Sequence, residues 1–455
     1  MAEAGPPAFA LVRSDGSTAS GPRRRVARWL GAALVVGFIL RALVGLATYG
    51  DRWNGRGGPP RDWWLSGYTE YGDIAISLVE GHGYRRGESL APRPPAYPLL
   101  LAGFYRVGGR SAWPPVLGQA AVGAAAVLVA FLIGHQACAP ATGVLAGWMA
   151  AVYPYYVAHD TAQQETALFT VLTGATVYVL LRARRSGSLA AHTAAGAVAG
   201  VALLCRETLG PFVLLAGVWL ARPNPARSAG RRLVLGGVFL GVAAFTVAPW
   251  LARNARVVGR PIFGGRPGYQ VWVGHNPSTL SHYPWGSIDR STDEALARMP
   301  PEERADLARL SEAARDRWFL RRGVSFALED PARLARYAAV KMLAAFGPFK
   351  SPLADGIAAN LTYSVSYVTV VFLGLVGVRA GPSRDLVSLT GLLVASFVAV
   401  TLPTHAHASH RSHLDLLLMV FAAAGAMHLA AKRLGRHRPR TTSGARSTGH
   451  FRGQR

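Results

Sequence analysis

The chain has 455 residues, of which 51% are hydrophobic and only 16% are charged, a composition typical of membrane proteins rather than of soluble globular domains. Its formal net charge of +25 would favour a nucleic-acid partner in a soluble protein. Here the basic residues lie in the tails and between apolar segments, where they orient the chain and contact anionic lipid. We therefore expect contact with the lipid bilayer and no nucleic-acid binding.

Apolar segments between the two tails predict an all-α, polytopic membrane protein with about ten transmembrane helices. One crossing needs about 20 apolar residues. The stretch from Ser111 to His159 contains no Lys, Arg, Asp or Glu, so it is predicted to hold two spans. The ten predicted spans lie near 29–48, 113–134, 141–158, 165–181, 189–205, 208–221, 233–251, 357–378, 386–402 and 414–431.

The short connections predict the orientation. Arginines precede the first span and follow the fourth, sixth and eighth spans, so an even number of spans places all of them on the cytoplasmic side. Residues 1–22 are then a disordered cytoplasmic tail, 23–431 the transmembrane domain, and 432–455 a basic cytoplasmic tail. Two long loops, 49–112 and 252–356, are external. The apolar run 96–107 is predicted to dip into the membrane without crossing it.

The second external loop shows helix signals. Pro300-Pro301-Glu302-Glu303 has the prolines and acids typical of a helix start, and apolar residues follow at helical spacing. Asp330-Pro331 caps a further amphipathic segment, which we expect to lie along the outer membrane surface.

Candidate functional residues gather at the predicted external ends of the spans. Glu70 and Asp73 are three residues apart, so both carboxylates fall on one face of a predicted helix. Arg93 precedes two prolines and an apolar run. Each also fits a simpler interpretation: a solvated helix face for the two acids, and a side chain reaching the lipid headgroups for Arg93. Arg41, inside the first span, is predicted to reach the headgroups in the same way and is given no functional role.

Further polar residues lie near the ends of later spans. They are Glu165, the pair Arg206-Glu207, Arg253 and the group from His405 to His413. Arg206-Glu207 also fits a local ion pair. The histidines lack accompanying cysteines or carboxylates, so we predict no metal site and no cofactor. Arginines facing an external surface suit a phosphate, which they bind with two parallel hydrogen bonds.

These segments resemble the C-type (GT-C) integral-membrane glycosyltransferases, and in particular the bacterial family 39 proteins related to protein O-mannosyltransferases and the lipid A aminoarabinose transferase. The resemblance covers about residues 29–431. It is carried by the order and spacing of six motifs. These are Glu70-Tyr-Gly-Asp-Ile-Ala-Ile-Ser-Leu with Gly81-His-Gly-Tyr84, Arg93-Pro-Pro-Ala-Tyr-Pro98, Glu165-Thr-Ala-Leu-Phe, Cys205-Arg-Glu207, Pro249-Trp-Leu-Ala-Arg-Asn254 and Val273-Gly-His-Asn276.

The resemblance implies a cell-membrane enzyme that moves a sugar from a polyprenyl-phosphate carrier to an acceptor on the extracytoplasmic side. The acid of the first external helix would be the general base, either Glu70 or Asp73. The donor phosphate would be bound by Arg93, Tyr97, Arg253 and Arg411. Supporting roles fall to Glu165, Arg206, Glu207 and His410.

The expected mechanism is direct displacement with inversion. Arginines would stabilise the leaving phosphate without a metal, and a single carboxylate would deprotonate the acceptor. Two other functions also fit a chain with many spans: a lipid-linked polysaccharide polymerase or ligase, and a transporter. The transporter predicts charges in the middle of spans and paired halves, which this sequence lacks.

Overall fold

The structure is a computed structural model that describes residues 20–49, 67–109, 113–350 and 356–436. Within these ranges the regular structure is helical, apart from an isolated β-bridge between Arg86 and Ser89. The prediction of an all-α fold is confirmed.

In the described part of the chain, seven helical segments are long and apolar enough to cross a membrane. They belong to α1 (Ser20–Tyr49), α4 (Trp113–Ala137), α7 (Thr166–Ser186), α10 (Ala229–Val258), α17 (Ile357–Arg379), α18 (Arg384–Thr401) and α19 (Ser412–Arg436). Three shorter apolar helices accompany them: α5 (Pro140–Val152), α8 (Leu189–Cys205) and α9 (Gly210–Ala221), the last preceded by the 3-10 turn η3 (Glu207–Leu209). Each of the ten predicted spans coincides with one of these helices.

Proline lies at two of the places where a span boundary differs from the prediction. The span predicted near 141–158 ends at Val152, because Tyr153 is extended before Pro154, and a separate short helix, α6 (Pro154–His159), follows. The span predicted near 233–251 continues through Pro249 to Val258. The second external segment therefore begins after α10 rather than at residue 252.

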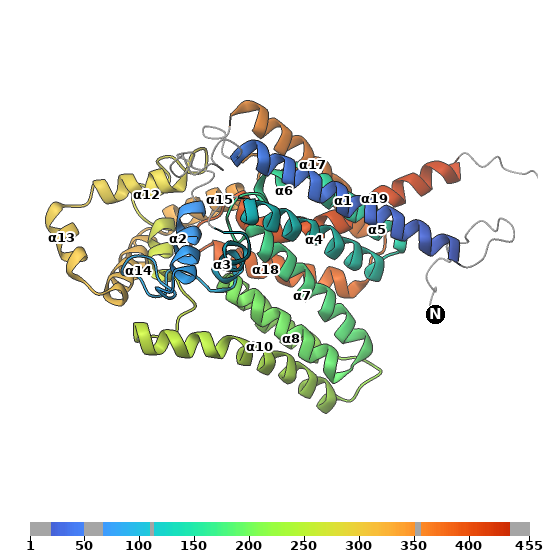
Figure 1. The fold of residues 1–455 in the computed structure, drawn as a ribbon, viewed down its shortest axis with the longest axis horizontal. Helices are drawn as coiled ribbons and strands as arrows, with labels where there is room; N and C mark the ends of the chain where they lie inside the picture. The colour runs from blue at the N-terminus through green and yellow to red at the C-terminus, as the bar shows by residue number, and fades with distance from the viewer. Residues whose placement is uncertain (1–19, 50–66, 110–112, 351–355, 437–455) are drawn as a thin grey trace, which may run out of the picture.

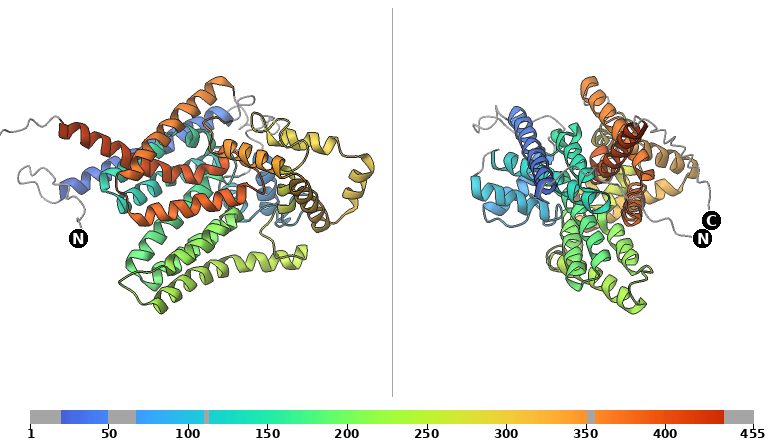
Figure 2. Two further views of the ribbon diagram at one scale, coloured as in Figure 1. Left: turned by 180° about the vertical axis from the view of Figure 1, so that it is seen from behind. Right: turned by 90° about the vertical axis from the view of Figure 1, so that its right-hand side faces the viewer.

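The helices form an elongated bundle whose two ends differ (Figure 1). α1 begins and α19 ends at one end of the bundle, whereas α2 (Gly67–Val79) and the helices α12 to α14 gather at the other (Figure 2). The predicted topology assigns the first of these ends to the cytoplasmic side and the second to the external side.

Small residues let the helix backbones approach closely inside the bundle. A Cβ atom added to Gly134 of α4 would lie 2.9 Å from the Cα atom of Gly143 in α5. A Cβ atom on Gly425 of α19 would lie 2.1 Å from the carbonyl oxygen of Leu373 in α17. Such contacts bring helices together in a membrane, where lipid is as apolar as the side chains and burial gives little driving force.

The expectation for Arg41 is wrong, because its side chain is fully buried. Its Nε atom donates to Asp160 at 2.7 Å, and its two Nη atoms donate to the carbonyl oxygens of Gly37, Ala150 and Ala151. The last two carbonyls belong to the final turn of α5, where no helical partner is available. Arg41 therefore closes the end of α5 and neutralises Asp160 inside the bundle.

The second external segment folds into five helices within the described residues. They are α11 (Pro267–Gly274), α12 (Ile288–Ala297), α13 (Pro301–Arg309), α14 (Glu312–Leu328) and α15 (Pro331–Phe346). The predicted starts at Pro301 and Asp330-Pro331 agree with α13 and α15, and the Asp330 carboxylate accepts from the backbone N–H groups of Ala332 and Arg333. The apolar spacing that runs through Leu310 is interrupted, because Ser311 caps the separate helix α14.

One buried cation ties this external segment to the bundle. Lys341 of α15 is fully buried, and its Nζ atom donates to the carbonyl oxygen of Leu402 at 2.8 Å and lies 3.1 Å from Nε2 of His275. Burial lowers the pKa of Lys341 to about 7. The His275 of the Val-Gly-His-Asn motif thus has a contact within the scaffold rather than an open position.

The predicted orientation can be tested by cysteine labelling of the full-length chain in intact cells. In a Cys138→Ser background, Arg309→Cys in α13 should react with a membrane-impermeant maleimide. Ser186→Cys at the end of α7 should react only after the cells are permeabilised. Both positions are exposed, so access to reagent depends on the side of the membrane. Labelling of both cysteines from the same side would contradict the even number of spans.

Candidate functional site

The site is built on α2 and on α3 (Ala96–Gly108), which pack against each other. Tyr71 and Ala75 of α2 are buried against Tyr97 and Leu101 of α3, with the rings of Tyr71 and Tyr97 edge to face at 5.0 Å. Tyr71 and Ala75 are four residues apart, so they lie on the same buried face of α2. Glu70 lies at the edge of this face, and its carboxylate is partly exposed.

Glu70 and Arg93 form an ion pair although 23 residues separate them. Nη2 of Arg93 donates to Oε2 of Glu70, and the guanidinium lies 5.6 Å from the centre of the Tyr71 ring. Burial opposes the charge of Arg93, but the Glu70 carboxylate raises the pKa of Arg93, so the side chain stays cationic. The structure therefore brings together the two residues to which the sequence assigns base and phosphate roles.

The backbone at Arg93 is fixed from two sides. The Tyr84 hydroxyl donates to the carbonyl oxygens of Arg93 and Pro94, at 2.8 and 3.1 Å. Gly264 packs against the same stretch of backbone, because a Cβ atom at this position would lie only 2.4 Å from the Arg93 carbonyl carbon. A larger residue at position 264 would displace the turn that presents Arg93.

A second ion pair lies next to the first. Nε of Arg206 donates to Oε1 of Glu165 at 3.1 Å, and its Nη2 donates to the same oxygen. The Tyr71 hydroxyl also hydrogen-bonds Glu165. Burial raises the pKa of Tyr71 well above its usual value, with Glu165 as the next cause, so the hydroxyl keeps its proton and acts as the donor. Tyr71 thus lies between the two ion pairs.

Glu207 and His410, the other two predicted supporting residues, lie near these ion pairs. Glu207 is within electrostatic reach of both Arg93 and Arg206, and His410 is within reach of Arg206. The rings of His405 and His410 are 5.3 Å apart. Across the described residues, no group of three or more His, Cys, Asp or Glu side chains is arranged to hold a metal ion.

Arg253 is placed beside the network and binds protein backbone. Its Nη1 atom donates to the carbonyl oxygen of Leu90 at 2.5 Å, and its Nη2 atom donates to that of Tyr84 at 3.1 Å. The guanidinium also stacks near the rings of Trp250 and Tyr84. In this arrangement Arg253 holds the loop between α2 and Arg93.

Arg411 lies inside the bundle, where only 2% of its surface is exposed. It donates to Asp415 at 3.0 Å, to the carbonyl oxygen of Ala345 at 2.5 Å and to the Tyr363 hydroxyl. Its guanidinium lies 3.9 Å from the centre of the Tyr367 ring. The structure thus separates Arg411 from open surface and gives it partners on α15, α17 and α19.

Arg86 is a residue of the site that the sequence analysis missed. Its Nη1 atom is 3.5 Å from Oε1 of Glu70, and its Nε atom is 3.2 Å from Oδ2 of Asp73. The adjacent pair Arg85-Arg86, between a carboxylate-bearing helix and Arg93, was the available signal. Only the folded loop shows which of the two arginines reaches the carboxylates.

Part of the chain is similar to a known protein family. Residues 92–251 match the sequence model of the dolichyl-phosphate-mannose-protein mannosyltransferase family. The matched segment begins one residue before Arg93 and includes Glu165 and Arg206. No curated protein matches the chain.

The chain is similar to solved structures at low sequence identity. The archaeal oligosaccharyltransferase AglB from Archaeoglobus fulgidus, in complex with an inhibitory peptide and a dolichol-phosphate, is 13% identical, with a TM-score of 0.50 over 91% of this chain. The chain spans only 51% of the length of AglB. ArnT from Cupriavidus metallidurans in the apo state is 16% identical, with a TM-score of 0.39 over 89% of this chain and 78% of ArnT.

ArnT bound to undecaprenyl phosphate is also 16% identical, with a TM-score of 0.39 over 92% of this chain and 79% of ArnT. The family match accounts for the motifs around Arg93, Glu165 and Arg206, and an enzyme is favoured over a transporter. Residues 92–251, about a third of the chain, are thus similar to the dolichyl-phosphate-mannose-protein mannosyltransferase family.

Proposed function

We propose that this protein transfers a sugar from a polyprenyl-phosphate carrier to an acceptor on the extracytoplasmic side, with inversion at the anomeric carbon. The observation that carries the proposal is the contact between Glu70 and Arg93. It places a carboxylate able to take a proton beside a cation able to bind a phosphate. Arg93 lies just before α3, an apolar helix that a lipid chain could follow.

Arg93 has the geometry expected of a phosphate ligand. Its Nη2 atom binds Glu70, while its Nε atom has no hydrogen-bond partner within the described part of the chain. A carrier phosphate would compete with Glu70 for this guanidinium, and the two side chains would separate as the phosphate binds. AglB, whose fold this chain shares, was solved with a dolichol-phosphate, which supports a lipid phosphate as the ligand here.

The proposed reaction is a single displacement. The acceptor hydroxyl or amine forms a bond to the anomeric carbon as the bond from that carbon to the phosphate oxygen breaks. Glu70 takes the acceptor proton, and the electron pair of the broken bond leaves with the polyprenyl phosphate. Arg93 stabilises the charge that develops on the phosphate. Attack opposite the leaving group inverts the anomeric carbon.

Glu165 and Arg206 keep the remaining charges paired. A buried Glu or Arg without a partner is costly, and removing one member of such a pair destabilises a protein by about 3–5 kcal/mol. We infer that this pair fixes the position of Tyr71, whose hydroxyl binds Glu165 and whose ring lies beside the Arg93 guanidinium. Tyr97 supports Tyr71 from α3, and Arg253 fixes the loop that ends at Arg93.

Substitutions at Arg93 test the phosphate assignment. Arg93→Lys keeps the charge but loses the planar pair of donors, so activity should fall substantially. Arg93→Ala should fall further and should weaken binding of undecaprenyl phosphate to the purified protein. Arg106→Ala, an exposed arginine at the far end of α3, is the matched control and should bind the carrier normally. Normal carrier binding by Arg93→Ala would exclude this role.

Substitutions on α2 test the base. Glu70→Gln keeps size and hydrogen bonding but cannot take a proton, so turnover of the polyprenyl-phosphate sugar should fall by about 10²–10⁴-fold. Carrier binding should not weaken. Asp73→Asn should be milder, because Asp73 contacts Arg86 and not Arg93. Glu302→Gln on α13 is the exposed control.

The comparison of the two α2 variants decides the assignment. Near-normal turnover in Glu70→Gln together with a collapse in Asp73→Asn would transfer the role of base to Asp73. Near-normal turnover in both would remove α2 from the chemistry.

A further inference from the structure

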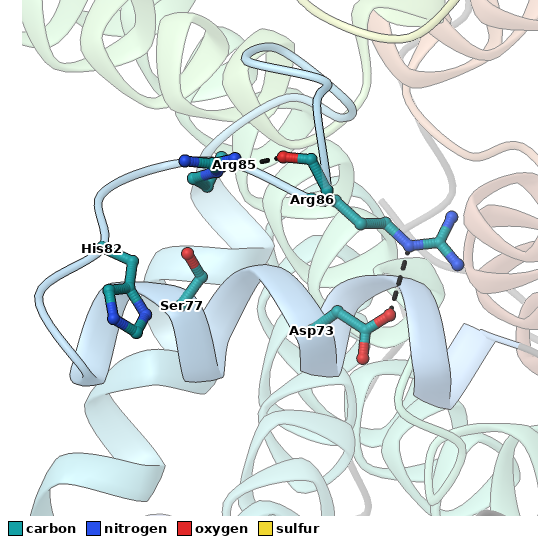
Figure 3. Close-up of a pocket in the computed structure, with 6 residues that line it drawn as sticks. Asp73, Ser77, His82, Arg85 and Arg86 are labelled. Atoms are coloured by element: carbon teal, nitrogen blue, oxygen red, sulfur yellow. Dashed lines mark hydrogen bonds and ion pairs between the residues drawn. The ribbon is translucent and has the colours of Figure 1, made fainter.

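A polar pocket of about 390 Å³ lies on the side of α2 that faces away from α3. It is lined by Asp73, Ser77, His82, Arg85, Arg86 and Gly87 (Figure 3). None of these residues offers the apolar surface that a polyprenyl chain needs, so the pocket suits a polar ligand. The proposed function gives it no role.

The pocket reaches the candidate base through one side chain. Arg86 lines the pocket and extends to Asp73, and its Nη1 atom is 3.5 Å from Oε1 of Glu70. The other oxygen of Glu70 is bound by Arg93. Both carboxylate oxygens therefore face a guanidinium, and Arg86 competes with an acceptor hydroxyl for Oε1.

The loop that carries Arg86 is fixed, while the side chain itself is free to move. Arg86 and Ser89 exchange backbone hydrogen bonds of 2.9 and 3.0 Å, and the Ser89 hydroxyl donates to Glu312 of α14. Arg253 binds the backbone on both sides of this turn. The Arg86 side chain is 42% exposed, so it can exchange partners by rotation about its own bonds.

The charges around the pocket leave an excess of positive charge. Among the residues that line it, Arg85 and Arg86 are cationic and Asp73 is the one carboxylate. The carboxylate closest to Arg85 is that of Glu88, 3.7 Å away on a fully exposed side chain, where water screens the interaction. Two neighbouring guanidiniums with one uncompensated charge favour an anionic group such as a phosphate or carboxylate.

We propose that this pocket is the acceptor subsite, and that it binds an anionic group of the acceptor through Arg85 and Arg86. As Arg86 engages that group, it leaves Glu70 and stays beside Asp73, so that Oε1 becomes available to the acceptor nucleophile. Asp73 is then a positioning residue that acts through Arg86. This inference rests on the proposed role of Glu70.

The test measures probe binding to the full-length protein in phosphatidylcholine nanodiscs by ligand-observed NMR. The probes are glucose 6-phosphate, methyl glucuronide and the neutral methyl glucoside. Both anionic probes, or one of them, should bind more tightly than the neutral sugar. Arg85→Gln and Arg86→Gln should each weaken that binding by about tenfold, the usual scale for a hydrogen bond to a charged group. The exposed control Arg309→Gln should change nothing.

A repeat in phosphatidylglycerol nanodiscs identifies the source of the anion. Loss of glucose 6-phosphate binding there would indicate a lipid headgroup, and unchanged binding would indicate a soluble acceptor. Equal binding of neutral and anionic sugars would overturn the proposal, as would normal binding by Arg85→Gln. Undecaprenyl phosphate binding, measured in the same samples, should be unaffected by Arg85→Gln. If the unmodified protein did not bind undecaprenyl phosphate, that result would instead count against the proposed function.

Discussion

The ion pair between Glu70 and Arg93 joins two groups that must separate for the proposed reaction to occur. Each neutralises the other in a partly buried position, where an isolated charge is costly. A carrier phosphate competes with Glu70 for Arg93, and its arrival would release the carboxylate on that side. The surrounding structure serves this contact: Tyr84 and Gly264 hold the backbone of Arg93, and Tyr71 supports its guanidinium.

The other buried charges form a scaffold beneath this pair. Arg206 neutralises Glu165, and Arg41 neutralises Asp160 while it binds the carbonyl groups at the end of α5. In these positions both partners are needed, because a single buried charge costs more than the pair. The site can therefore hold several charges inside the protein, while Glu70 stays partly exposed.

The sequence predicted the parts of this structure that depend on local pattern. Long apolar runs located the ten helices, and the spacing of Glu70 and Asp73 placed both on α2. Family resemblance supplied the pairing of roles between Glu70 and Arg93. The sequence could not show what a distant arginine contacts. Arg253 and Arg411 have the residue type expected of phosphate ligands, yet they bind backbone carbonyls and an internal aspartate.

Competition for Arg93 is most directly measured as the affinity of undecaprenyl phosphate for the unmodified protein and for Glu70→Gln. Loss of the carboxylate charge frees Arg93, so the variant should bind the carrier more tightly, by roughly two- to fivefold, the range expected for a partly exposed ion pair. The gain should disappear in an Arg93→Ala background, because the competition no longer exists there. Unchanged or weaker binding by Glu70→Gln would contradict the account, since Arg93 and Glu70 would then not exchange partners when the carrier binds.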